Sequence, residues 1–152
     1  MIVKPMIRNN VCMNAHPVGC ARYVQEQIDY VRSRGQFDGP KNALIIGASN
    51  GYGLATRITA AFGAGANTIG IGFEKGPSKK RTGSAGYYNL QAFDEAAAAE
   101  GLGYETINAD AFSHETKQDV VERIRRRFGS VDLVVYSLAS GLRIDPDTGE
   151  QY

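Results

Sequence analysis

The stretch from Ala43 to Phe62 constrains the fold more than any other, because it predicts a strand, a turn of small residues and a helix in direct succession. Leu44 to Ile46 are aliphatic, the turn begins at Gly47, and apolar residues then recur at the spacing of one helix face, at Leu54, Ile58, Ala61 and Phe62. A helix that begins at such a turn points unpaired backbone N–H groups, and the positive end of its dipole, at the space above the strand end. The stretch therefore predicts a binding site for a diphosphate.

The predicted turn contains three glycines, and each has a physical task. Gly47 lets the chain leave the strand sharply, Gly51 lets the backbone approach a pyrophosphate, and Gly53 lets the helix pack close to the strand. The fingerprint G-x-G-x-x-G is not met from Gly51, since its third position is Thr56, and the observed G-x-x-x-G-x-G spacing is that of short-chain dehydrogenases. A tight strand-to-helix turn without any ligand is the alternative.

A carboxylate after the next strand favours the dinucleotide hypothesis. The pattern from Asn67 to Phe73 predicts a strand, and Glu74 follows it about twenty residues after the glycines. A dinucleotide site has an acidic residue at this place for the adenosine ribose hydroxyls. Because surface carboxylates are common, Glu74 supports the hypothesis only together with the glycines.

An esterase is a competing hypothesis, since Gly47 to Gly51 also matches G-x-S-x-G, the nucleophile elbow of the α/β-hydrolases, with Ser49 as nucleophile. That mechanism needs an acid and then a histidine further along the chain. The only histidine after Ser49 is His114, at an expected helix start. We therefore reject the esterase.

Composition indicates one globular domain in 152 residues, with 43% hydrophobic content and a net charge of +1. The charge gives no indication of nucleic acid, and the dense basic cluster from Lys79 to Arg81 lies in an expected loop. No apolar stretch approaches the ~20 residues of a membrane span. The N-terminus has no apolar region typical of a secretory signal, so we expect a cytoplasmic location.

The pattern C-x-x-x-H-x-x-x-C, formed by Cys12, His16 and Cys20, raises the question of a metal site. Three ligands are one short of a closed tetrahedral zinc site, and Pro17 interrupts any helix that would align them on one face. We expect no metal, and instead buried thiols and a hydrogen-bonded histidine near the nucleotide pocket.

The rest of the chain alternates helical and strand patterns. An amphipathic helix is expected from Val18 to Arg34, and a loop from Lys75 to Gly86. The later elements are a helix from an Asn89 cap to Glu100, a strand from Tyr104 to Asn108, a helix capped by Ser113 that buries Val120, Val121, Ile124 and Phe128, and a strand from Val131 to Leu138 covered on both faces.

Strands that alternate with helices predict an α/β fold, with a Rossmann-like parallel sheet, helices on both faces and strand order 3-2-1-4, as in half of a doubly wound short-chain-dehydrogenase-like fold. Residues 1–40 would form an N-terminal helical extension that packs on the sheet, and residues 41–152 the dinucleotide-binding half. The singled-out residues all follow strands, where a dinucleotide lies across such a sheet. Asp110 would lie near the adenine, or act only as a helix cap, and Leu138 and Ala139 would flank the nicotinamide-side ribose.

Several sequence blocks, taken together, resemble the trans-2-enoyl-CoA reductase family, which includes the long bacterial enoyl-acyl carrier protein reductases that use NADH. The likeness runs over essentially the whole chain, in the same order and spacing. The blocks are Val3-Lys4-Pro5, Ala15 to Cys20, Gly47 to Ala55, Phe73-Glu74-Lys75, Tyr88-Asn89, Ala92-Phe93-Asp94, Asp110 to Ser113, Val134 to Ser140 and Pro146 to Gly149.

The resemblance implies an NADH-dependent reduction of trans-2-enoyl thioesters, carried by CoA or acyl carrier protein, in fatty acid metabolism. It also implies that Glu74 discriminates against NADPH. The implied cofactor-binding positions are Gly47, Ala48, Ser49, Asn50, Gly51, Tyr52, Phe73, Glu74, Asp110, Ala111, Leu138 and Ala139.

Two departures from the family limit what the resemblance implies. Gly141-Leu142-Arg143 stands where the family has Pro-Val-Arg, beside the substrate channel. Members of the family are much longer, and their catalytic tyrosine and lysine lie beyond this chain, in which none of the six lysines has a tyrosine nine positions before it. We therefore expect the N-terminal, cofactor-binding portion of a reductase, inactive alone and able to associate through an exposed sheet edge. A non-catalytic module that binds or senses NAD(H) is the alternative.

Overall fold

The computed structural model describes residues 4–9, 11, 12, 14–79, 81–139 and 144–151. Its centre is a four-stranded parallel sheet of β3 (Asn42–Ile46), β4 (Asn67–Gly72), β5 (Tyr104–Asn108) and β6 (Leu133–Tyr136). The strands lie in the order β5-β4-β3-β6, so the predicted α/β class and the order 3-2-1-4 are confirmed. Gly141 to Arg143, the departure from the family pattern, lie outside the described residues.

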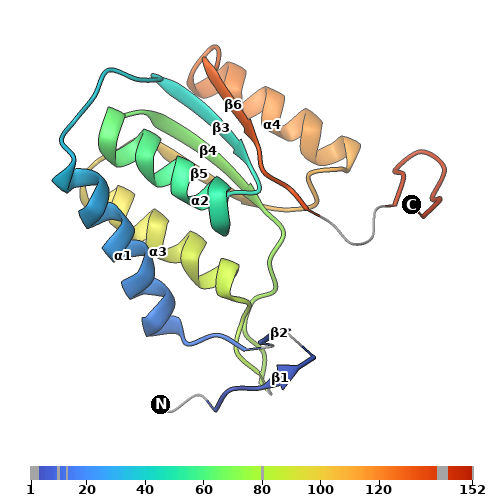
Figure 1. Cartoon of the computed structure of the whole chain (residues 1–152). Coiled ribbons are helices and arrows are strands. Elements are labelled where there is room, and N and C mark those ends of the chain that lie inside the picture. Colours follow the sequence, from blue (N-terminus) through green and yellow to red (C-terminus); the bar gives the residue numbers. More distant parts are fainter. Residues whose placement is uncertain (1–3, 10, 13, 80, 140–143, 152) are drawn as a thin grey trace.

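Helices cover both faces of this sheet, as predicted (Figure 1). One face carries α1 (Pro17–Ser33), α2 (Gly51–Ile58) with its π-helical continuation η1 (Thr59–Gly63), and α3 (Ala85–Ala99). The other face carries α4 (His114–Arg127). The crossovers from β3 to β4 and from β4 to β5 move along the sheet in one direction, and the crossover from β5 to β6 moves back in the other. Because all three connections are right-handed, α4 lies on the opposite face from α2 and α3.

The core is apolar on both sides of the sheet. On the α1 side, Val24, Ile28, Leu54 and Phe93 are buried together, and the ring of Phe93 meets that of Phe62 edge to face with centroids 5.8 Å apart. On the α4 side, Val120 of the helix packs in one buried cluster with the strand residues Leu44, Ile69, Ile71 and Ile107. Burying such side chains contributes about 1.5 to 3 kcal/mol each, which makes this core the main source of stability.

The N-terminal segment adds a two-stranded antiparallel sheet of β1 (Ile7–Arg8) and β2 (Val11–Cys12) before α1. α1 begins at Pro17, one residue before the predicted start at Val18, because His16 caps it by accepting a hydrogen bond from the Gly19 N–H, 3.2 Å from Nδ1, and Pro17 takes the first helical position. Val24 and Ile28 pack α1 against the other helices of its layer. The division at residue 40 stays a prediction.

Three sequence predictions are wrong in detail. α3 begins at Ala85 rather than at an Asn89 cap, because Gly86 fits inside the first helical turn where a larger residue would collide with Glu74. β6 ends at Tyr136, level with the end of β3, and its residues Val134 and Tyr136 are exposed, so the strand is not covered on both faces. Val121 also faces outward on α4, whereas Val120 is buried.

Within the described residues, no helix has both the length and the apolar character that a membrane crossing requires.

Candidate functional site

The turn between β3 and α2 has the close packing that its glycines were predicted to allow. Gly47 has a φ of +93°, and a Cβ there would lie 2.0 Å from the carbonyl oxygen of Ser137, which directly follows the neighbouring strand β6. A Cβ on Gly53 would lie 2.0 Å from the carbonyl oxygen of Gly47. A side chain at Gly47 would therefore push the turn away from the end of β6, and one at Gly53 would push α2 away from the turn.

Gly51 differs from these two glycines, because its surroundings are open. Its φ is +53°, and a Cβ there would meet no atom within 4 Å. Gly51 is the first residue of α2, and the preceding N-cap residue, Asn50, makes no side-chain cap. The first N–H groups of α2 therefore have no partner inside the helix, and the space beside Gly51 is open, which suits an anion.

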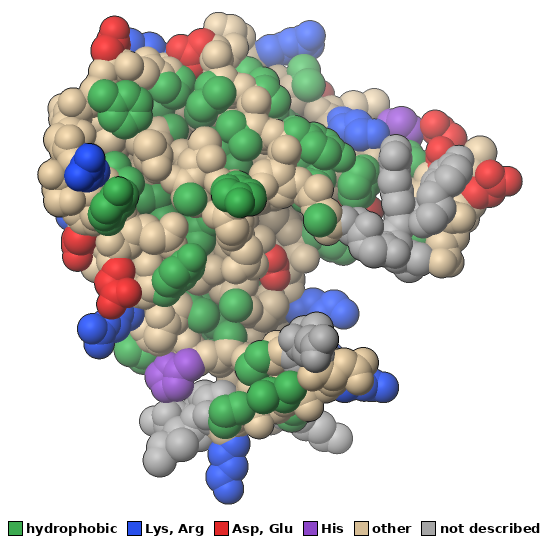
Figure 2. Space-filling view, viewed as in Figure 1, with side chains coloured by type: hydrophobic (Ala, Val, Ile, Leu, Met, Phe, Trp, Pro, Cys, Tyr) green, Lys and Arg blue, Asp and Glu red, His purple; other side chains and the backbone are tan. Residues whose placement is uncertain are grey.

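A cavity of about 570 Å³ lies beside this turn, at the carboxyl ends of all four strands. The space-filling view shows the outline of the molecule indented below the C-terminal segment (Figure 2), and Ile144 of that segment lines the cavity. The structure brings nine of the twelve predicted cofactor positions together in the lining of this cavity, namely Gly47, Ser49, Asn50, Phe73, Glu74, Asp110, Ala111, Leu138 and Ala139.

The other three predicted positions do not line the cavity. Ala48 is fully buried beneath the turn, where its N–H and that of Gly47 both donate to the carbonyl of Ile71. Gly51 lies in the open turn described above, and the Tyr52 side chain is 87% exposed. Their assignment to the cofactor stays a prediction, as does that of the nine lining residues.

Glu74 is held firmly at the edge of the cavity. The Ser49 hydroxyl donates to its Oε1 at 2.6 Å, and the Ser84 hydroxyl donates to its Oε2 at 2.5 Å. Its backbone is paired with the Asn108 side chain, which accepts from the Glu74 N–H at 2.7 Å and donates to the Glu74 carbonyl at 3.0 Å. A carboxylate fixed in this way presents a charge of constant position to a ligand.

Two contacts of this site were missed by sequence reasoning. Ser84 was assigned to a loop, and Asn89 was predicted as a helix cap, yet Asn89 is buried inside α3 and donates from Nδ2 to the Ser49 carbonyl and to Asn50 Oδ1. One signal was available in the sequence, because Asn89 lies four residues before Phe93 and so shares the apolar face of the helix. A polar residue on that face needs a buried partner.

Asp110 is not the N-cap residue of α4, which was one of its two predicted roles, and its place near the adenine stays a prediction. It lines the cavity, and its Oδ1 also accepts from the Phe112 N–H at 2.9 Å in the turn that leads into α4. The helix itself is capped by Ser113, whose hydroxyl accepts from the Thr116 N–H, as predicted.

The rejected sites have other contacts in the structure. Ser49 donates to Glu74, whereas the Nε2 of His114 lies 2.8 Å from Asp147, so the two residues do not form a hydrolase pair. Cys12 is exposed rather than buried, and Cys20 is half-buried, which raises its pKa. Among the described residues, no three His, Cys, Asp or Glu side chains come close enough to share a metal ion.

A buried arginine anchors α2 to the sheet below the site. Arg57 is fully buried, and its guanidinium donates to Thr68, to Thr106 and to the carbonyl of Glu105 at 2.9 to 3.2 Å. It also lies 3.9 Å from the centroid of the Phe93 ring and 3.8 Å from a carboxylate oxygen of Asp94. Burial lowers the pKa of Arg57 to about 10, so the group stays charged at neutral pH.

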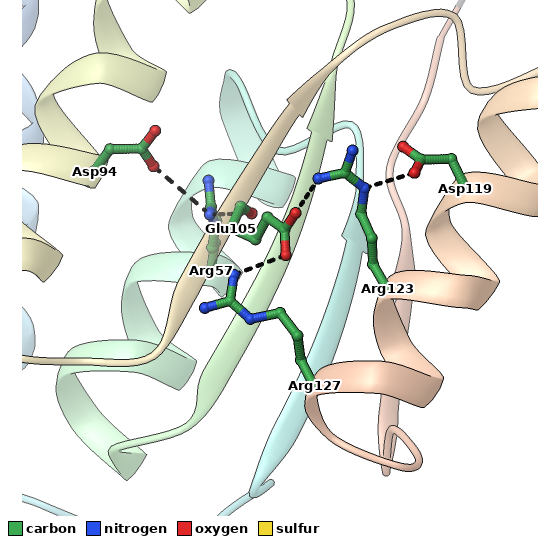
Figure 3. A network of polar contacts seen from close by, with 6 residues as sticks. All are labelled: Arg57, Asp94, Glu105, Asp119, Arg123 and Arg127. Atoms are coloured by element: carbon green, nitrogen blue, oxygen red, sulfur yellow. Dashed lines mark hydrogen bonds and ion pairs between the residues drawn. The ribbon is translucent and has the colours of Figure 1, made fainter.

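β5, which carries two of the hydrogen-bond partners of Arg57, also carries an ionic cluster that faces α4. Glu105 accepts hydrogen bonds from Arg123 and Arg127, and Arg123 also donates to Asp119 (Figure 3). Partial burial disfavours the Glu105 charge, but the two arginines outweigh this and hold the pKa of the carboxyl below its ordinary value. The two clusters attach α2 and α4 to opposite faces of β5.

A parallel sheet, a glycine turn that opens into a helix N-terminus and a cavity across the strand ends define a dinucleotide-binding domain of the Rossmann type. The chain belongs to the trans-2-enoyl-CoA reductase family. Residues 2–79 match the family model described as the NAD(P)H binding domain of trans-2-enoyl-CoA reductase, and residues 81–152 match the model described as its catalytic region.

Curated relatives and solved structures agree with this family. The chain is 57% identical to an enoyl-[acyl-carrier-protein] reductase [NADH] of Pseudoalteromonas atlantica, over all of this chain and 39% of the relative. It is 56% identical to a trans-2-enoyl-CoA reductase [NADH] of Treponema denticola, over 98% of this chain and 39% of the relative.

The crystal structure of the Treponema denticola trans-2-enoyl-CoA reductase in complex with NAD matches with a TM-score of 0.93 and 55% identity, over 99% of this chain and 39% of that one. That of the Clostridium acetobutulicum enzyme with NADH matches with a TM-score of 0.95 and 48% identity, over 100% of this chain and 38% of that one. The chain thus spans about two fifths of the length of the relatives it matches.

Proposed function

We propose that this chain supplies the NADH-binding half of a reductase for trans-2-enoyl thioesters, carried by CoA or by acyl carrier protein. The observation that carries the proposal is the cavity at the strand ends, lined by nine predicted cofactor positions. The names of the relatives, which specify NADH and either enoyl-CoA or enoyl-acyl carrier protein, support the cofactor and the substrate class.

Each part of the site has a proposed task. The open N-terminus of α2 at Gly51 binds the diphosphate, and the Glu74 carboxylate accepts hydrogen bonds from the adenosine ribose hydroxyls. Asp110 and Ala111 border the adenine, while Leu138 and Ala139 border the ribose on the nicotinamide side. When bound, NADH supplies the hydride that reduces the double bond of the thioester.

The acid that completes the reaction is a separate matter. Reduction of an enoyl thioester puts negative charge on the carbonyl oxygen, and a positioned acid must stabilise it. The 152 residues contain no tyrosine with a lysine nine or four positions after it. Tyr52 and Tyr136 have exposed side chains and do not line the cavity. We therefore propose that the chain alone binds NADH but does not turn over substrate.

One experiment tests both parts of the proposal. Calorimetric titration of the 152-residue protein, of verified mass, should show NADH binding, and an absorbance assay with crotonyl-CoA should show no appreciable NADH oxidation. Loss of oxyanion stabilisation typically costs a factor of about 100 to 1,000 in rate. Absence of NADH binding would refute the proposed site. Turnover at the rate of an ordinary enzyme would show that a residue of this chain acts as the acid, with Tyr136 and Tyr52 the first to replace.

Binding without turnover is also the behaviour of the second candidate, a module that senses NAD(H) without catalysis. Adding the remaining polypeptide of a homologous reductase distinguishes the two. Recovery of crotonyl-CoA reduction supports the reductase, whereas unchanged inactivity together with tight NADH binding favours the sensing module.

A further inference from the structure

The N-cap of α2 is occupied by a residue that does not cap. Asparagine is among the best N-cap residues, because its side-chain oxygen accepts from the N–H of the second or third helical residue. Asn50 has the extended backbone of an N-cap, with φ of −149° and ψ of 171°, yet its side chain makes no such hydrogen bond. Its Oδ1 instead accepts from Asn89 Nδ2 at 2.9 Å.

Asn89 is placed to make this contact and one other. It is 3% exposed, and the same Nδ2 donates to the Ser49 carbonyl at 3.0 Å. A carbonyl can only accept, which fixes the orientation of the Asn89 amide with its nitrogen toward the turn. Both amide hydrogens are therefore used on the two residues that precede α2.

The hydrogen bonds from Asn89 to Ser49 and Asn50 leave another polar atom of Asn89 without a partner, which indicates that Asn89 serves the turn before α2 rather than the packing of α3. Asn89 Oδ1 is buried and makes no hydrogen bond within the described part of the chain. A buried acceptor without a partner destabilises a fold, so an apolar residue at this place would suit the core better. The glycine in the first turn of α3 also lets this helix approach the Asn50 side chain closely, because a Cβ on Gly86 would lie 2.7 Å from the Asn50 side-chain nitrogen.

We propose that Asn89 is a positioning residue, which holds the Asn50 side chain away from α2 and so keeps the first N–H groups of the helix available for the diphosphate of NADH. The inference rests on the proposed function of the site. A released Asn50 side chain would cap the helix and occupy the N–H groups of Tyr52 or Gly53, which are the donors that the diphosphate needs. Asn50 and the ligand would then compete.

The test is a pair of substitutions with calorimetric NADH titration as the readout. Asn89→Leu, which keeps the approximate volume but removes both donors, should weaken NADH binding about tenfold, the size expected for the loss of one hydrogen bond to a charged group. Adding Asn50→Ala to Asn89→Leu should restore part of the affinity, because alanine has no side-chain oxygen with which to cap the helix. A role in packing alone cannot produce such a recovery.

Ala97→Gly is the control, since it disturbs the same helix at a buried position near its C-terminal end, with no contact to the turn or to Arg57 among those described. It should lower the melting temperature but leave NADH affinity within about twofold of the parent. Asn89→Ala, with the same Asn50 change, replaces Asn89→Leu if the leucine protein does not fold.

The outcomes separate the inference from the function on which it rests. If the parent protein does not bind NADH, the proposed function is wrong. If the parent binds and Asn89→Leu binds equally well, or if the double variant binds no better than Asn89→Leu, the positioning inference is wrong while the NADH site stands.

Discussion

The charge of Glu74 should decide between NADH and NADPH. The two cofactors differ by the 2′-phosphate on the adenosine ribose, and the proposed site puts the Glu74 carboxylate beside that ribose. Because Ser49 and Ser84 each hold one carboxylate oxygen, Glu74 cannot turn away from a phosphate without losing a hydrogen bond. The informative change is Glu74→Gln, which keeps the length of the side chain and removes its charge.

The size of the effect follows from Coulomb's law. Two unit charges ~4 Å apart repel by about 4 kcal/mol at an effective dielectric constant near 20. The exposed Lys75, which follows directly in the chain, offsets part of this repulsion. A net penalty of about 2 kcal/mol corresponds to NADPH binding that is roughly thirtyfold weaker than NADH binding. Glu74→Gln should reduce this ratio to about threefold or less.

Calorimetric titration of parent and variant with both nucleotides measures the ratio directly. Glu26→Gln, on the exposed surface of α1, makes the same chemical change away from the cavity and should leave the ratio unaltered. Raising the salt concentration should narrow the ratio in the parent but not in Glu74→Gln, since only the parent discriminates by charge. Equal binding of the two nucleotides by the parent, or the same ratio in Glu74→Gln, would refute the reasoning.

Gly51→Asn should block NADH binding, because asparagine tolerates the φ of +53° but fills the open space at the turn. The control Gly101→Asn, at another open glycine with a φ of +68°, should bind NADH like the parent. Equal NADH titration curves for Gly51→Asn and the parent would exclude Gly51 from the site. Glu105→Gln should lower the free energy of unfolding by about 1 kcal/mol at pH 7. Because the pKa of Glu105 is lowered in the folded state, its carboxylate stabilises the fold fully above about pH 4.3, and this stabilisation is lost as the pH falls through the lowered pKa. On the acid side, the melting temperature of Glu105→Gln should therefore fall less steeply with pH than that of the parent. Parallel plots of melting temperature against pH for the two proteins would contradict this. Val134→Lys should reduce self-association in sedimentation experiments, since a charge on the exposed edge strand β6 opposes strand pairing, and unchanged association would point to another surface.

Local patterns were sufficient to predict most of the sheet and the helices. Leu44 to Ile46 lie within β3, and β5 spans Tyr104–Asn108 as predicted, because runs of branched and aromatic residues between turn signals have few other stable conformations. The caps were equally local. Ser113 was predicted as the cap of α4 and accepts from an N–H three residues later, whereas α1 begins one residue before its predicted start because His16, which was not predicted as a cap, accepts from the Gly19 N–H.

The errors arose where a residue's partner is distant in the sequence. Gly83 to Gly86 has the composition of a loop, but Ser84 is the N-cap residue of α3 and uses its hydroxyl on Glu74, ten residues earlier. Asn89 has its partners about forty residues earlier, at the turn before α2. No local pattern predicts these contacts, because they depend on how closely α3 approaches the ends of β3 and β4.

The buried Arg57 shows why such distant contacts determine the geometry of the site. Its charge is removed from water, which is tolerable only while the hydrogen bonds to Thr68, Thr106 and the Glu105 carbonyl are all made. Those partners lie on β4 and β5, and Gly70 leaves the space for the guanidinium, since a Cβ there would lie 2.5 Å from it. A slide or rotation of α2 would break these bonds and leave the charge unpaired. The position of the α2 N-terminus, and with it the proposed diphosphate site, is therefore tied to the register of two strands that the glycine motif does not include.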